Sequence, residues 1–231
     1  MKKYLVIGNP VKHSLSPKLH NYWMKQNNIN ASSDRKQLSE SDIVEIISEM
    51  RNDKINGLNV TVPFKKSVIP FLDELTSLAS ETQSVNTIYK DKNKVVGHNT
   101  DAGGFELALK HINYDVKNKK VFILGAGGVV SSIVLTLKKM KVGKIVLSNR
   151  TKKKAEELKK IYPDLEIIDW GETPDFNMII NATSLGLKKN DQVPFDVTKT
   201  SSKCIIIISP GLFHWKKEKR STSHIKKCSQ L

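Results

Sequence analysis

Cysteine, metal-binding clusters and long apolar runs are scarce in this chain. Only two cysteines, Cys204 and Cys228, occur among 231 residues, too few for a disulfide framework, so we expect a reducing, cytoplasmic setting. No apolar run approaches the roughly 18 residues that a membrane-spanning helix needs. The short run after residues 1–3 is interpreted as a first strand, not a signal peptide. No cysteine–histidine cluster has metal spacing. These absences favour a globular protein that needs neither a membrane nor a metal.

Acidic residues are also few relative to basic ones. The chain has 38 Lys and Arg against 23 Asp and Glu, a formal net charge of +15. A nucleic-acid-binding surface is one interpretation. However, only four of the cations are arginines, lysines alternate with acids along 152–160 as on a solvated helix face, and no aromatic and basic stripe stands out. We therefore expect no nucleic-acid partner.

Apolar strand-like runs alternate with amphipathic stretches along the chain, which is typical of α/β proteins with parallel sheets. Strands are predicted at 3–8, 55–62, 85–89, 94–98, 119–124, 144–148, 177–182 and 203–208. Helices are predicted at 16–27, 41–51, 67–80, 102–112, 128–140 and 151–162. The Ser16 hydroxyl is predicted to cap the first helix, with Pro17 at its first position. The polar stretch 29–40 gives no clear pattern.

The segment VFILGAGGVV (121–130) runs an apolar strand into a glycine-rich turn that opens a helix. Gly125 permits the tight turn, Gly127 lets the backbone approach a pyrophosphate, and the helix N-terminus offers free N–H groups to the anion. Val130 stands where a third small residue is usual. The alternative is an ordinary glycine turn before a buried helix. We favour a dinucleotide site.

The second strand of this unit ends at SNRTKKK (148–154), with cations where NAD sites usually carry an acid. A 2′-phosphate would meet the Arg150 guanidinium, the Thr151 hydroxyl and the Asn149 amide. The sequence therefore predicts NADP as the cofactor. An ordinary surface role for Arg150 is the alternative.

These patterns predict an N-terminal α/β domain joined to a Rossmann-like, doubly wound domain. The joint is placed near residues 101–104, where a strand-like stretch passes through two glycines into a helix. Residues 1–101 would form the substrate domain and 102–211 the dinucleotide domain. Residues 212–231 are interpreted as an atypical basic tail.

Polar residues gather where the strands of the first hundred residues end. They occur in HSLSP (13–17), NVTVPFK (59–65), SVNT (84–87) and GHNTD (97–101). Open α/β sheets bind ligands at the carboxyl ends of their strands. Hydroxyl, amide, ammonium and carboxylate groups together suit a small polyhydroxylated acid.

Several ordered motifs resemble those of the shikimate dehydrogenase family. They are residues 6–17, 57–65, 84–87, 97–105 and 123–128, with NRT at 149–151 and NATSLG at 181–186. The resemblance covers about residues 1–208 in order. It implies reversible oxidation of shikimate to 3-dehydroshikimate with NADP, a step of chorismate and aromatic amino acid biosynthesis.

The resemblance also implies roles for individual residues. Lys65 and Asp101 correspond to the catalytic pair. Substrate contacts fall on Ser14, Ser16, Thr61, Asn86 and Thr100. Cofactor contacts fall on Gly125, Ala126, Gly127, Gly128, Asn149, Arg150, Thr151, Lys154, Asn181, Thr183 and Ser184. His13 and His20, beside the first helix, are interpreted as structural.

Elementary chemistry agrees with this pair. Moving a hydride from a secondary alcohol requires a group that removes the hydroxyl proton. Lys65 fits if its pKa, near 10.4 in the free amino acid, is lowered by burial or if Asp101 assists proton exchange. Capping of the helix 102–112 is a second role for Asp101, and the two roles are compatible.

After residue 208 the chain departs from the family pattern. An Asp-x-x-Tyr-x-Pro segment, a further glycine-bearing stretch and a last helix are expected, whereas SPGLFHWKKEKRSTSHIKKCSQL stands here. A frame change or truncation near residue 208 is our hypothesis, which resequencing of the coding DNA tests. Two alternatives therefore stay open: a catalytically impaired protein that binds shikimate and NADP, and a quinate/shikimate dehydrogenase that uses NAD. The sequence permits a monomer or a homodimer.

Overall fold

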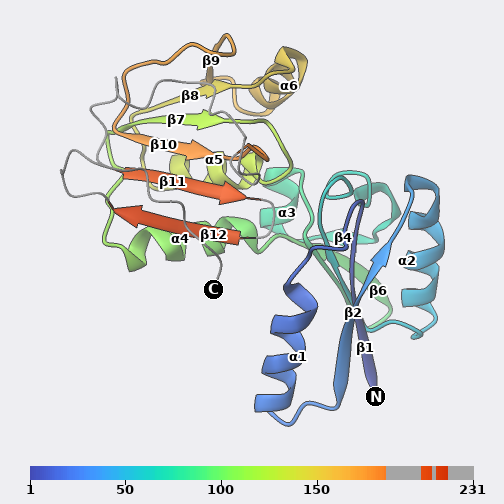
Figure 1. The fold of residues 1–231 in the computed structure, drawn as a ribbon. Helices are drawn as coiled ribbons and strands as arrows, with labels where there is room; N and C mark the ends of the chain where they lie inside the picture. The colour runs from blue at the N-terminus through green and yellow to red at the C-terminus, as the bar shows by residue number, and fades with distance from the viewer. Residues whose placement is uncertain (186–203, 210–211, 218–231) are drawn as a thin grey trace.

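The computed structural model describes residues 1–185, 204–209 and 212–217, and it contains two six-stranded sheets (Figure 1). The first sheet has the strand order β2-β1-β3-β5-β6-β4. Its strands are β1 (Lys2–Gly8), β2 (Ala31–Gln37), β3 (Gly57–Val60), β4 (Glu74–Leu75), β5 (Thr87–Asp91) and β6 (Lys94–His98). Strand β1 is parallel to β2 and β3, whereas β5 is antiparallel to β3 and β6. The first sheet is therefore mixed.

Three helices accompany the first sheet: α1 (Ser16–Gln26), α2 (Ile43–Arg51) and α3 (Ser77–Thr82). Helix α2 buries Ile43, Ile46, Ile47 and Met50, the spacing of a helix with one apolar face. These side chains join Leu5, Leu58 and other sheet residues in one core. The two short 3-10 helices η1 (Glu40–Asp42) and η2 (Ile69–Phe71) lie in the connections.

The second sheet has the order β12-β11-β10-β7-β8-β9. Its strands are β7 (Lys120–Leu124), β8 (Lys144–Ser148), β9 (Glu166–Ile168), β10 (Met178–Asn181), β11 (Cys204–Ser209) and β12 (Leu212–Lys217). All neighbours are parallel except β11 and β12. The chain winds from β7 outward to β9, then returns to β10 on the other side of β7. This reversal is the switch point where doubly wound sheets bind ligands.

Helices α4 (Asp101–His111), α5 (Val130–Lys139) and α6 (Lys152–Ile161) belong to this second unit. Residues 130–137 of α5 are all buried, because α5 contacts α3 and α4 as well as lying in the core beneath β7 and β8. A helix that is buried on all sides is apolar all round. The serines and the threonine of α5 are exceptions and matter below.

The structure confirms the two-part α/β fold with a Rossmann-like second sheet. The single helix predicted at 67–80 is wrong. Pro70 sits in the short helix η2, Asp73 donates its N–H to Val95 of β6, and the Thr76 hydroxyl accepts from the Ala79 N–H. Helix α3 therefore begins only after this cap. Strands β2 and β9 were not predicted, since β2 is polar and β9 has three residues.

Two expectations about chain ends of elements also change. Ser16 is the first residue of α1 and Leu15 occupies the cap position, with no side-chain cap. The Ser16 hydroxyl instead accepts a hydrogen bond from Ser14 Oγ at 3.3 Å. Residues 212–217, assigned from the sequence to a tail, form β12. The remainder of that tail, and residues 186–203 and 210–211 of the expected dinucleotide domain, lie outside the described residues.

Within the described part of the chain, no helix is both long and apolar enough to cross a membrane. The same part holds no cluster of His, Cys, Asp or Glu suited to a metal ion.

Candidate active site

Lys65 and Asp101 form an ion pair, with 2.7 Å between Lys65 Nζ and Asp101 Oδ2. Lys65 lies in the turn after β3, and Asp101 is the first residue of α4. Their side chains are 13% and 15% exposed, so each charge loses much of its water and depends on the other. An amine and a carboxylate held together at a strand end are suited to proton transfer with a hydroxyl group.

Asn86 holds the second oxygen of this carboxylate. Its Nδ2 donates to Asp101 Oδ1 at 2.9 Å and to Thr100 Oγ1 at 2.8 Å, while its Oδ1 accepts from the Thr100 N–H at 3.0 Å. Both carboxylate oxygens of Asp101 are therefore fixed, one by Lys65 and one by Asn86. The structure thus brings four predicted residues into one hydrogen-bonded cluster.

The remaining predicted substrate residues lie at the same edge of the first sheet. Ser14 and Ser16 follow β1 and bond each other, and Arg35 Nε donates to the Ser14 carbonyl at 2.7 Å. Thr61 follows β3 and donates its N–H to Ile7 of β1 at 2.9 Å. The serine pair forms a unit of its own beside the Lys65 cluster. Together these groups offer hydroxyls and a cation to a polar acid.

The glycine turn after β7 has the geometry that its sequence predicts. Gly125 has φ +106°, and a Cβ there would lie 2.9 Å from the Ala182 carbonyl oxygen, so only glycine fits without strain. Ala126 donates its N–H to Asn149 Oδ1 at 3.1 Å. A Cβ at Gly127 would have no atom within 4 Å. The backbone at Gly127 is therefore open to a ligand such as a pyrophosphate.

The same turn reaches the Lys65 cluster. A Cβ built on Gly128 would lie 3.4 Å from both Cβ and Cδ of Lys65. The turn that begins the dinucleotide unit therefore lies against the stem of the lysine from the first unit. This contact places a bound dinucleotide and the Lys65–Asp101 pair at one locus.

The residues after β8 present cations at the expected place for a 2′-phosphate. Asn149 is used internally, because its Nδ2 donates to the Thr151 carbonyl at 2.7 Å while its Oδ1 binds the glycine turn. Arg150, Thr151 and Lys154 are exposed. Lys152 pairs with Asp169 at 2.8 Å, which raises the pKa of Lys152 through a hydrogen bond to that carboxylate. The exposed guanidinium and the open glycine turn fit the two phosphate positions of NADP.

The loop after β10 lies beside Gly125 and is held by its own side chains. Asn181 is 8% exposed. Its Oδ1 accepts from the Thr183 N–H at 3.0 Å and from Thr183 Oγ1 at 2.6 Å, and its Nδ2 donates to the Leu185 carbonyl at 2.8 Å. Ser184 is exposed. Asn181 therefore shapes this loop, and Ser184 faces solvent.

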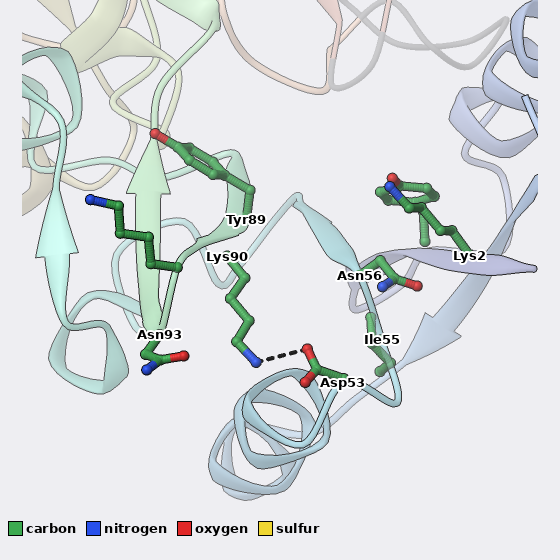
Figure 2. A pocket seen from close by; sticks show the side chains of 9 residues that line it. Lys2, Asp53, Ile55, Asn56, Tyr89, Lys90 and Asn93 are labelled. Atoms are coloured by element: carbon green, nitrogen blue, oxygen red, sulfur yellow. Dashed lines mark hydrogen bonds and ion pairs between the residues drawn. The ribbon is translucent and has the colours of Figure 1, made fainter.

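A separate hollow of about 550 Å³ lies at the opposite edge of the first sheet (Figure 2). It is lined by Lys2, Tyr4, Asp53, Ile55, Asn56, Tyr89, Lys90, Lys92 and Asn93, and Lys90 Nζ pairs with Asp53 Oδ1 at 2.7 Å. Lys2 begins β1, whereas the predicted site follows its end at Gly8. A seven-residue strand spans roughly 20 Å, so this hollow is distinct from the candidate active site.

The two histidines near α1 do not join the Lys65 cluster by any hydrogen bond found in the described part of the chain. His20 stacks on Trp23, with ring centroids 6.2 Å apart, and burial lowers the pKa of His20. His13 is exposed. This arrangement supports their interpretation as structural residues.

Two buried residues beside the site were not singled out from the sequence. Ser84 and Asn99 are both fully buried, and each lies two residues before a member of the cluster, Asn86 or Asp101. Their only signal was a polar side chain directly next to a motif residue. Their contacts are described below.

A doubly wound sheet whose glycine turn abuts a lysine–aspartate pair defines a two-domain, nicotinamide-dependent oxidoreductase. Comparison with protein families makes the assignment specific. Residues 6–88 match the shikimate dehydrogenase substrate binding domain, and residues 106–184 match shikimate / quinate 5-dehydrogenase. The chain belongs to the shikimate dehydrogenase family.

Individual relatives support this assignment. The chain is 60% identical over 200 residues to the shikimate dehydrogenase (NADP(+)) of Pelagibacter ubique, covering 87% of this chain and 76% of the relative. It is similar to the crystal structure of shikimate dehydrogenase from Aquifex aeolicus, with 37% identity, a TM-score of 0.79 and coverage of 85% and 74%. A Thermus thermophilus shikimate 5-dehydrogenase in complex with NADP(H) and shikimate gives 28% identity, a TM-score of 0.73 and coverage of 81% and 70%.

Proposed function

We propose that this chain catalyses the reversible, NADP-dependent oxidation of shikimate to 3-dehydroshikimate, within chorismate biosynthesis. The observation that carries this proposal is the Lys65–Asp101 pair lying against the glycine turn at Gly128. Relatives named shikimate dehydrogenase (NADP(+)), and a similar structure that holds NADP(H) and shikimate, support it.

In this proposal residues 1–101 bind the substrate, residues 102–211 bind the cofactor and residues 212–231 follow as a basic tail. The core beneath the first sheet and the core around α5 support two units, because each sheet has its own cluster of buried side chains. Helix α4 packs in the second core through Phe105 and Leu109, which supports a joint near residue 101.

Lys65 holds and moves the proton. Its ammonium, 2.7 Å from Asp101, would bond the substrate hydroxyl that is oxidised and accept its proton in the neutral form. Asp101 orients the amine and offers its carboxylate to a neighbouring hydroxyl. Asn86 and Thr100 fix Asp101, and Ser14, Ser16 and Thr61 would bind the substrate carboxylate and the remaining hydroxyls.

NADP, when bound, supplies the nicotinamide that exchanges a hydride with the substrate carbon. Gly125, Ala126, Gly127 and Gly128 would hold its pyrophosphate at the start of α5. Asn149, Arg150, Thr151 and Lys154 would hold its 2′-phosphate side. Thr183 and Ser184, in the loop shaped by Asn181, would border the rest of the cofactor.

Turnover and binding test the proposal together. We expect shikimate-dependent formation of NADPH, seen as an increase in its near-ultraviolet absorbance, with the unmodified chain. Titration calorimetry with NADP and with shikimate distinguishes the alternative of a protein that binds both ligands without turnover. Quinate with NAD in the same assay tests the other alternative. Failure to bind either NADP or shikimate would overturn the proposal.

We further propose that the protein acts in the cytoplasm as a monomer or homodimer on small-molecule substrates. Sedimentation equilibrium at working concentrations tests the oligomeric state. A mass of three or more chains would contradict it.

A further inference from the structure

A seam of buried polar side chains joins the two units beside the active site. On one side it contains Thr82, Ser84 and Asn99, and on the other Ser131, Ser132 and Thr136 of α5. Each is at most 3% exposed, and together they make up most of the buried polar side chains among the described residues. Figure 1 shows α3 and α5 meeting here, between the two sheets. Polar side chains at this depth are stable only when they are hydrogen-bonded.

Asn99 is the centre of this seam. Its Nδ2 lies 2.8 Å from the Ser84 carbonyl and 2.9 Å from Ser132 Oγ. Its Oδ1 accepts from the Ala102 N–H at 3.2 Å, in the first turn of α4 that also carries Asp101. One side chain therefore connects the helix of the catalytic aspartate to the helix that follows the glycine turn.

Ser84 makes the direct connection to the glycine turn. Its Oγ donates to the Gly128 carbonyl at 2.9 Å. The next residue, Val85, donates its N–H to the Lys65 carbonyl at 2.8 Å, and Asn86 bonds the Asp101 carboxylate. Three consecutive residues thus hold the cofactor turn, the lysine backbone and the aspartate side chain.

We propose that Ser84, supported by Asn99 and Ser132, is a positioning residue that sets the distance between the glycine turn at Gly128 and the Lys65–Asp101 pair. The inference rests on the proposed function for its catalytic consequence. Hydride transfer depends steeply on distance, and a displacement of about 1 Å can cost about a hundredfold in rate. Removing the Ser84 hydroxyl leaves the Gly128 carbonyl without this donor, so the turn is free to shift relative to Lys65.

The matched control is Ser33, another buried serine, in β2. It is 6% exposed, and its hydroxyl is a buried side-chain oxygen without a hydrogen-bond partner among the described residues. Ser33→Ala and Ser84→Ala therefore delete the same atom from equally buried places, but only the second deletes a bond between the two units. Ser132→Ala removes a second arm of the seam and serves as an independent variant.

The experiment compares the full chain with these three variants by amide hydrogen exchange and by steady-state kinetics. We expect Ser84→Ala to speed exchange at residues 127–132 at least about tenfold, with exchange in β1 and β3 unchanged. We expect its kcat to fall about ten- to hundredfold, with the KM for shikimate within about twofold of Ser33→Ala. The primary deuterium isotope effect on kcat, with deuterium on the oxidised carbon, should increase in Ser84→Ala and change in the same direction in Ser132→Ala.

Each outcome decides the matter. Ser84→Ala that matches Ser33→Ala in both exchange and kcat overturns the proposal. A loss of kcat without any change in exchange or in the isotope effect also overturns it, because the turn has then not moved. If the unmodified chain binds NADP and shikimate but does not turn over, the proposed function fails, and exchange at residues 127–132 alone decides whether Ser84 holds the turn.

Discussion

Lys65 and Asp101 are 36 residues apart in the sequence, yet their charged atoms are 2.7 Å apart. The lysine comes from the turn after β3 and the aspartate from the first turn of α4. Between them lie β5 and β6, which bring the chain back antiparallel to β3. The pair is thus a product of the mixed sheet, and the chemistry assigned to it can be tested directly.

Lys65→Ala should reduce kcat by about a hundredfold or more, because it removes the group that exchanges the proton with the substrate hydroxyl. Lys66→Ala is the matched control, since Lys66 is the adjacent, exposed lysine. NADPH formation under saturating substrate measures the effect. Equal kcat values in the two variants would remove Lys65 from the mechanism.

Arg150→Ala should raise the KM for NADP about tenfold or more and leave the KM for NAD nearly unchanged. A charge-assisted hydrogen bond from the guanidinium to the 2′-phosphate contributes about 1.5–3 kcal/mol, and NAD lacks that phosphate. Lys159→Ala, on the exposed face of α6, controls for loss of one positive charge. Parallel losses with both cofactors would contradict a role for Arg150 in selecting NADP.

Gly125→Ala and Gly127→Ala should separate folding from cofactor binding. Alanine at Gly125 requires φ +106° and a close approach to the Ala182 carbonyl, so we expect a loss of about 1–3 kcal/mol in the free energy of unfolding. Alanine at Gly127 meets open space, so unfolding should change little while the Kd for NADP increases. Urea denaturation and calorimetric titration measure the two effects. The reverse pattern would show that the cofactor does not approach Gly127.

Asp73 predicts a specific loss of stability in acid. Hydrogen bonds from Arg51 and from the Val95 N–H hold the pKa of Asp73 below its ordinary value of 3.8. A carboxyl group whose pKa is lowered by folding stabilises the protein fully above its unfolded pKa, and this stabilisation is lost as the pH falls through the folded pKa. Stability should therefore fall with Asp73 protonation below about pH 3.8.

The corresponding experiment compares the melting temperatures of the unmodified chain and Asp73→Asn across the acid range. The difference should be largest near neutral pH and should shrink below about pH 3.8. Asp91→Asn, an exposed carboxylate at the end of β5, controls for the change in net charge. A difference between the unmodified chain and Asp73→Asn that stays constant down to pH 2 or so would refute the assignment.

Much of the second unit was predictable because its signals are local. Strand β7, the glycine turn and the cations after β8 lie in short stretches whose chemistry depends on neighbours in the sequence. Where tertiary contacts overrode local pattern, prediction failed. The stretch 67–80 looks helical, but the pairing of Asp73 with Val95 and the cap at Thr76 divide it. The polar strand β2 forms because β1 offers it a parallel partner over seven residues.

The candidate site divides in the same way. The resemblance of its motifs named Lys65, Asn86, Thr100 and Asp101, and the structure places all four in one cluster. The seam at Ser84 and Asn99 had no comparable signal. A buried serine and a buried asparagine read as ordinary polar residues until the helix that they bond is in place.

The order of residues alone determined the two nucleotide-binding phosphate positions, the alternation of strands and helices, and the membership of this chain in its family, because each depends on side chains close together along the chain. The folded structure decided which of those side chains meet. It brought the lysine, the aspartate and the glycine turn to one place through hydrogen bonds between segments up to 44 residues apart. Such contacts form only when both units have folded, since burial gives their polar groups no partner other than each other.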